Sequence, residues 1–149
     1  MILPQTLQKH SLFGGLEEEQ IKTIFPLLQQ ENYEPNEMII TEGKSNDKIY
    51  FIIEGQVAVT KGDVLITRFG EGEAFGEMEV LDVMPSAASI KSLSSVKIMS
   101  ISNKALREIY KLDVKIFSLL LMNLARYLCR RLRKMNERLT SASPPPISD

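Results

Sequence analysis

The sequence predicts a mainly β protein, a sandwich or jelly-roll barrel, with helices at its N-terminus and a long C-terminal helix. Two patterns support this fold class. Short apolar runs, each bounded by turn-forming residues, follow one another closely between residues 38 and 101, as is typical of many short strands. Apolar residues recur instead at helical spacing over residues 16–30 and 114–139. A chain of 149 residues has room for one domain with a proper core and a helical appendage.

The N-terminal region is predicted to be helical. Residues 4–13 are typical of a short helical turn that ends at a Gly-Gly pair. Over residues 16–30, three consecutive glutamates near the start suit the positive end of a helix dipole. Pro26 lies inside this run, so we expect it to kink or divide a helix that packs on the barrel.

Six strands are expected in the central region. Residues 49–53 are apolar on both faces, as in a fully buried strand, whereas residues 56–60 alternate like a half-exposed one. A Lys-Gly-Asp sequence at 61–63 predicts a tight hairpin turn. The expected strands cover residues 38–41, 49–53, 56–60, 64–69, 89–93 and 96–101.

Two helices should follow the strands. Ser102 and Asn103 can cap a short helix over residues 104–110, and Asp113 can cap a longer one over residues 114–139. The longer helix carries a heptad-like apolar seam. The seam consists of Val114, Phe117, Leu121, Leu124, Leu128, Leu132, Met135 and Leu139.

The width of this apolar face changes along the helix. It is broad in the first half, which suits packing on the barrel, and narrow beyond Arg126, which suits a partner helix. We therefore expect residues 1–112 to form the N-terminal helices and the barrel, and residues 113–139 to form a helix that mediates a homodimer. Residues 140–149 have the composition of a disordered tail.

Composition disfavours several function classes. A net charge of −1 gives no global field that would steer the chain to nucleic acid or to a membrane. With Cys129 as the single cysteine, no internal disulfide is expected, which fits a cytoplasmic location. His10 is the single histidine, and we expect it at the surface or partly packed, not in a metal or catalytic site. Neither a signal peptide nor a transmembrane run is evident.

Residues 70–90 organise the chain. Glycines at positions 70, 72 and 76 require a tight turn or a close approach of the backbone. Residues 77–81 favour a short helix that Pro85 ends. A glycine-rich turn that leads into a helix leaves free backbone N–H groups, the usual arrangement of a phosphate site, although it can also be a plain barrel corner.

This stretch resembles the phosphate-binding cassette of cyclic nucleotide-binding domains. That family's pattern runs Phe-Gly-Glu-(Leu/Met)-small-Leu-Ile, a short gap, and then Pro-Arg-(Ser/Ala)-Ala-Thr-Val. Here residues 75–81 read FGEMEVL and residues 85–90 read PSAASI. LFGGLEEEQIKTI is similar to the family's N-terminal helix, and ITEGKSNDKIYFIIEGQVAV to the first half of its eight-stranded β-roll. The resemblance covers about residues 12–139 and implies this jelly-roll, or double-stranded β-helix, fold.

The resemblance also implies a site for cAMP or cGMP. The family's glutamate, here Glu77, accepts a hydrogen bond from the ribose 2′-hydroxyl, while Gly76 and Met78 offer backbone N–H groups. Where the family has an arginine that forks onto the phosphate, this chain has Ser86, which can supply one neutral hydrogen bond. The residues expected to bind ligand are Phe75, Gly76, Glu77, Met78, Ser86, Ala87 and Ala88. Nearby basic residues that could reach in are Arg68 and Lys91.

Two functions remain open from the sequence. The first is a sensor that binds cAMP, cGMP or a related ligand and signals through helix 114–139 to an effector protein. The second is a degenerate, ligand-free dimerisation or docking module, because losing a buried charge-assisted pair costs about 2–5 kcal/mol of binding. An enzyme is not expected, since no nucleophile–base pair and no metal-ligand cluster appears, and no cofactor is implied.

Residues 126–138 hold six basic side chains and one acidic one. We interpret them as the solvated flank of a coiled coil and expect no direct DNA binding, because no helix-turn-helix module follows. Cys129 adjoins the seam and is expected to be a buried or interfacial thiol.

Overall fold

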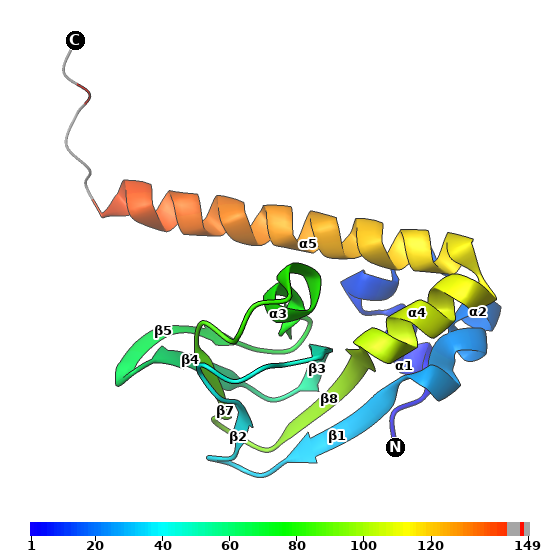
Figure 1. Cartoon of the computed structure of the whole chain (residues 1–149), viewed down its shortest axis with the longest axis horizontal. Coiled ribbons are helices and arrows are strands. Elements are labelled where there is room, and N and C mark those ends of the chain that lie inside the picture. Colours follow the sequence, from blue (N-terminus) through cyan, green and yellow to red (C-terminus); the bar gives the residue numbers. More distant parts are fainter. Residues whose placement is uncertain (143–146, 148–149) are drawn as a thin grey trace.

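The computed structural model describes residues 1–142 and residue 147 of the chain. Two antiparallel sheets form a roll, short helices gather at one end of it, and one long helix runs along its side (Figure 1). The predicted jelly roll with flanking helices and a long C-terminal helix is thereby confirmed.

The strands are β1 (Gln29–Tyr33), β2 (Met38–Ile40), β3 (Lys48–Glu54), β4 (Val57–Lys61), β5 (Val64–Phe69), β6 (Ala74–Phe75), β7 (Ser89–Ser92) and β8 (Val96–Ser102). The helices are α1 (Pro4–Gln8), α2 (Glu18–Ile24), α3 (Glu77–Asp82), α4 (Asn103–Leu112) and α5 (Val114–Ser141), with 3-10 turns η1 (Ser11–Phe13) and η2 (Phe25–Leu27). One sheet has the order β1-β8-β3-β6 and the other β2-β7-β4-β5.

Strand β3 is apolar on both faces because both faces of its sheet are covered. Ile49 and Phe51 pack into a core shared with the helices. Tyr50 and Ile52 point the other way, into the core between the two sheets. Since successive strand residues point to opposite faces, this burial agrees with the continuous apolar run that predicted a fully buried strand.

Two strands were not predicted. Strand β1 has the sequence QQENY, and its first two residues fall in the helix predicted over residues 16–30. It is an edge strand held by antiparallel pairing with β8. Strand β6 has only two residues and pairs with β3 through Tyr50 and Phe51. Neither carries an alternating apolar pattern, so backbone pairing with a distant strand decides both.

The helix expected over residues 16–30 is shorter than predicted. Helix α2 ends at Ile24, and Pro26 lies in the 3-10 turn that follows, so the predicted division at this proline is confirmed. The chain then turns directly into β1.

Helix α5 begins at the predicted cap. The Asp113 Oδ1 atom accepts hydrogen bonds from the backbone N–H groups of Lys115 and Ile116 at 2.9 and 3.2 Å. Farther along, the buried Asn123 amide donates to the carbonyl oxygens of Leu12 and Gly14 at 3.0 and 2.7 Å, which ties the helix to the N-terminal segment.

The apolar seam of α5 divides between two environments. Leu124 is buried in the helix-side core and Leu128 packs against that core, so the seam contacts the chain's own roll beyond Arg126. Leu132 and Leu139 are exposed instead. The helix ends at Ser141, and residues 143–146 and 148–149 of the expected disordered tail lie outside the described residues.

Two side chains differ from their predicted environment. His10 is buried against the rings of Phe13 and Phe51, and its Nδ1 atom accepts a hydrogen bond from the backbone N–H of Leu12 at 3.2 Å. Burial lowers the pKa of His10 to about 4. Cys129 is exposed on the single chain, so its predicted burial within the chain is wrong, whereas its predicted place at an interface stays a prediction.

Candidate functional site

The cassette turns sharply at Gly76. This residue adopts a φ of +84°, and a Cβ atom there would lie 2.6 Å from the carbonyl oxygen of Lys48, so only glycine fits. The Asn46 amide donates to the carbonyl oxygens of Lys48 and Gly76 at 2.8 and 3.2 Å and holds the turn against β3. The turn leads from β6 into α3, the short helix that the sequence predicted.

Glu77 is the first residue of α3, and its side chain points into the protein. The residue is 1% exposed. Its Oε1 atom accepts a hydrogen bond from the Arg131 Nη1 atom at 2.6 Å, whereas its Oε2 atom is buried without a partner in the described residues. Burial raises the pKa of Glu77 above its ordinary value, and the nearby Arg131 guanidinium offsets part of that effect.

Arg131 comes from α5 and stacks on the roll. Its guanidinium carbon lies 4.3 Å from the centre of the Phe69 ring and 6.0 Å from that of Tyr127, and its side chain is 25% exposed. One turn earlier on α5, the Tyr127 hydroxyl donates to the Ala74 carbonyl oxygen and accepts from the Ala74 N–H, both at 3.0 Å. The long helix is therefore bonded to the first residue of β6 and to the first residue of α3.

Sequence reasoning missed Arg131 as a site residue and placed it in a solvated flank. Arg68 and Lys91, which were considered instead, form no ion pair with Glu77 in the described residues. A usable signal did exist. Tyr127 and Arg131 continue the spacing of the buried Leu124 at intervals of three and four residues, which places them on the face of α5 that contacts the roll.

Ser86 occupies a buried position in the second half of the cassette. Its backbone N–H donates to the Lys44 carbonyl oxygen at 2.9 Å, and its carbonyl oxygen accepts from the Gly43 N–H at 2.8 Å. The residue is 3% exposed, and its hydroxyl has no partner among the described residues. Two predicted site residues thus each carry a buried oxygen atom that is free to bond a polar group, Ser86 and Glu77.

The other predicted site residues fall into two groups. Phe75 is buried and stacks on Tyr50, with 5.0 Å between ring centres, and Ala88 packs partly buried against the core between the sheets. Met78 and Ala87 have exposed side chains. The structure therefore buries Phe75, Gly76, Glu77 and Ser86 and leaves Met78 and Ala87 with their backbone groups alone as candidate contacts.

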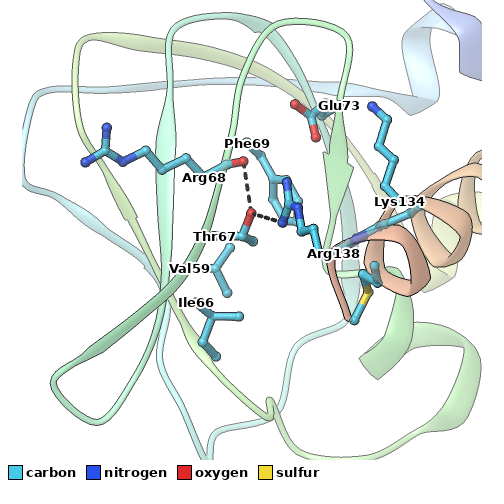
Figure 2. A pocket seen from close by; sticks show the side chains of 10 residues that line it. Val59, Ile66, Thr67, Arg68, Phe69, Glu73, Lys134 and Arg138 are labelled. Carbon is cyan, nitrogen blue, oxygen red and sulfur yellow. Dashed lines mark hydrogen bonds between the residues drawn. The ribbon is translucent and has the colours of Figure 1, made fainter. Parts of the chain in front are cut away.

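A pocket of about 230 Å³ lies between β4, β5 and the last turns of α5 (Figure 2). Apolar side chains and charged side chains share its walls. Its lining is Val59, Ile66, Thr67, Arg68, Phe69, Glu73, Arg131, Lys134, Met135 and Arg138.

The described residues contain no group of three or more His, Cys, Asp or Glu side chains placed to hold a metal ion. None of the described helices combines the length and the apolar character that crossing a membrane requires.

Comparison with known proteins agrees with this geometry. Residues 30–113, more than half of the chain, match the family model described as a cyclic nucleotide-binding domain. The chain is 29% identical to a cAMP-dependent protein kinase regulatory subunit of Yarrowia lipolytica, over 72% of this chain and 28% of that protein. It is 28% identical to a CRP-like cAMP-activated global transcriptional regulator of Mycobacterium tuberculosis, over 92% of this chain and 62% of that protein.

The chain thus spans less than two thirds of the length of either relative. In fold, it is similar to a crystal structure of a cyclic nucleotide-binding domain from Methylobacillus flagellatus, with a TM-score of 0.84 and 24% identity, over 97% of this chain and 84% of that one. The resemblance expected from the cassette is confirmed: this chain belongs to the cyclic nucleotide-binding domain family.

Proposed function

We propose that this chain is a non-catalytic sensor domain that binds cAMP or cGMP at the cassette and signals through α5. The observation that carries the proposal is the ion pair between Glu77 of the cassette and Arg131 of α5. Glu77 is the carboxylate expected to accept the ribose hydroxyl, so a bound nucleotide would share this carboxylate with Arg131 and change the ion pair. Two relatives whose names describe them as cAMP-dependent and cAMP-activated support this ligand class.

The proposed signal is a change in how α5 contacts the cassette. A ligand shifts a two-state equilibrium only by its difference in affinity for the two states. In the structure, Arg131 is bonded to Glu77, and Tyr127 is bonded to Ala74 beside it. A nucleotide that bonds the same carboxylate changes the strength of the ion pair with Arg131 and so favours a different position of the distal helix, which an effector protein could detect.

The buried oxygen atoms of the cassette indicate how the ligand would be held. The free Oε2 atom of Glu77 can accept from a ribose hydroxyl, and the Ser86 hydroxyl can donate to a phosphate oxygen. A neutral hydroxyl is a weaker partner for the phosphate than an arginine fork. We therefore expect low affinity. The proposed binding residues are Phe75, Gly76, Glu77, Met78, Ser86, Ala87 and Ala88.

Calorimetric titration with cAMP and with cGMP tests the proposal. Wild type should bind at least one of them, Glu77→Gln should bind it more weakly, and the neighbouring Glu79→Gln should serve as a charge-matched control with unchanged affinity. Ser86→Arg should tighten binding by about 2 kcal/mol, roughly thirtyfold, if the variant retains the wild-type circular dichroism spectrum. Hydrogen exchange over residues 110–130 should change on binding. Binding without such a change would refute the signalling role of α5.

We also propose that α5 mediates a homodimer. Leu132 and Leu139 are 57% and 69% exposed and lie seven residues apart on one side of the helix, as in a parallel coiled coil. Leu132→Asp with Leu139→Asp should give a monomer in sedimentation equilibrium. Leu128 is unsuitable for this test, because it packs against the chain's own core. A dimer of undiminished affinity would place the interface elsewhere.

A ligand-free docking module is the second candidate. It is favoured by one observation: Arg131 already occupies the Glu77 carboxylate, while the cassette lacks a positive charge at position 86. If neither nucleotide binds wild type or Ser86→Arg, whereas the dimer persists, this second function replaces the first.

A further inference from the structure

A second pocket, of about 140 Å³, lies where the N-terminal segment meets the roll. Its walls come from the end of α1, from β3 and from the turn between β5 and β6. Its lining is Thr6, Lys9, His10, Ile52, Ile53, Glu71 and Gly72. None of these residues is among the seven expected to bind a nucleotide, and none lines the pocket beside α5. The second pocket is therefore separate from the site described above.

His10 supplies this pocket with a buried hydrogen-bond donor. The residue is 8% exposed, and its Nδ1 atom already accepts from the backbone N–H of Leu12 at 3.2 Å. Burial lowers the pKa of His10 to about 4, so the ring is neutral at neutral pH and carries its one proton on Nε2. The Nε2 atom is buried and has no partner among the described residues. Because an unpaired buried donor costs free energy, this N–H favours an acceptor atom in the pocket.

The opposite wall is fixed by backbone hydrogen bonds. The Gly72 N–H donates to the Ile52 carbonyl oxygen at 3.0 Å, and the Ile52 N–H donates to the Glu73 carbonyl oxygen at 2.8 Å. These bonds tie the turn between β5 and β6 to β3. The aromatic contacts of His10 hold the other wall. The pocket is therefore preformed, and binding requires little ordering of the chain.

The charges of the lining are one cation and one anion, Lys9 and Glu71. Neither forms an ion pair in the part of the chain that the structure describes. A simple carboxylate would be attracted by Lys9 and repelled by Glu71, and a simple amine would meet the reverse. A ligand that carries both charges satisfies both side chains, and its carboxylate also offers the acceptor that His10 requires.

Size restricts this ligand further. The volume of about 140 Å³ is well below the roughly 300–1,000 Å³ typical of complete small-molecule sites, so the pocket suits a ligand of a few non-hydrogen atoms. A small free amino acid, with a carboxylate next to an ammonium group, combines this size with these charges.

We propose that this pocket binds a small zwitterionic amino acid, such as free glycine. The His10 Nε2–H and Lys9 would hold its carboxylate, Glu71 would hold its ammonium group, and the Thr6 hydroxyl would be an additional polar contact. A ligand of so few atoms has little surface to bury, so the expected affinity is modest.

The test uses free glycine, acetate and methylamine as probes of the full chain at neutral pH. His10 is the single histidine, so its ring nitrogen signals in an NMR spectrum need no assignment. Glycine should shift the Nε2 signal with a saturable dependence on concentration, and methylamine should not. Acetate should bind at least about threefold more weakly than glycine, because Glu71 repels it.

Two double variants test the charges. Lys9→Gln with Glu71→Gln should weaken glycine binding by at least about fivefold, because two charged contacts are lost. Lys97→Gln with Glu54→Gln is the matched control. It removes the same pair of charges at an exposed ion pair outside the pocket and should change glycine affinity less than about twofold. Both variants keep the net charge of the chain.

Several results would overturn the proposal. These are no saturable shift with glycine, equal affinity for glycine and acetate, equal losses in the two double variants, or a proton found on Nδ1 instead of Nε2 of His10. A cassette that binds no cyclic nucleotide leaves these outcomes unchanged, since the two sites share no residue.

Discussion

Arg131→Gln and Glu77→Gln both break the ion pair between α5 and the cassette, but they should lower the free energy of unfolding by different amounts. Arg131→Gln leaves the Glu77 carboxylate uncompensated at a position that is 1% exposed. Glu77→Gln leaves a guanidinium that is 25% exposed and can reach water while still stacking on Phe69. Arg131→Gln leaves the buried carboxylate without a counter-charge and should therefore be the less stable of the two variants.

The expected magnitudes follow from burial. Removing one partner of a fully buried pair costs about 3–5 kcal/mol, and the partial exposure of Arg131 favours the lower end. We expect Arg131→Gln to lower the free energy of unfolding by about 3 kcal/mol at pH 7, including its lost stacking on Phe69. Glu77→Gln should cost about 1 kcal/mol, since its amide oxygen can still accept from Arg131.

The pH dependence gives a second, independent signature. Removing Arg131 removes the positive charge that offsets the effect of burial, so the pKa of Glu77 in the folded state rises further. The folded state then binds a proton more readily than the unfolded state. Stability relative to wild type should then recover as the pH falls from 7 to 5, by up to about 1.4 kcal/mol per pH unit while the pH lies below the folded-state pKa. The Arg131→Gln, Glu77→Gln double variant should show no such recovery.

Urea denaturation followed by circular dichroism, at one fixed protomer concentration and at pH 7 and 5, provides these numbers. Arg131→Lys is the matched control, because it keeps the charge and loses the fork and the stacking geometry. Equal costs for Arg131→Gln and Glu77→Gln, or a cost of Arg131→Gln that does not change with pH, would refute the reasoning.

Three further predictions concern stability. Burial lowers the folded-state pKa of His10 to about 4, so the stability that neutral His10 contributes is complete above pH 6.5 and is lost as the pH falls toward 4. Over this window the free energy of unfolding should fall by about 3 kcal/mol more in wild type than in His10→Asn. Equal pH profiles of the two proteins would contradict this prediction. Gly76→Ala should cost at least about 2 kcal/mol more than Gly72→Ala in urea denaturation, because both residues have positive φ but only at Gly76 would the new Cβ meet a backbone oxygen at 2.6 Å. Asp113→Ala should lower the thermal midpoint by losing about 1–2 kcal/mol of N-cap stabilisation, whereas Asp113→Asn should retain most of it.

Local patterns were sufficient for most of the fold. The cap at Asp113 and the division at Pro26 each depend on a few consecutive residues whose own sterics or hydrogen bonds select the conformation. The both-face apolar run of β3 predicted its burial in the same way. The family cassette, whose motif is contiguous, placed Glu77 and Ser86 at the candidate site.

Only the tertiary structure decided how that site is completed. Glu77 and Arg131 are 54 residues apart, and no local pattern links a cassette carboxylate to one of the six basic residues at positions 126–138 of a distant helix. The polar strand β1 likewise exists because β8 offers it a row of backbone partners. The burial of His10 depends on Phe13 and Phe51, which meet only when the helices close over the sheet. Such contacts are set by packing between elements far apart in the chain. The sequence by itself therefore determined which residues the cassette contains, and the tertiary structure determined that Glu77 of the cassette faces the positive charge of Arg131.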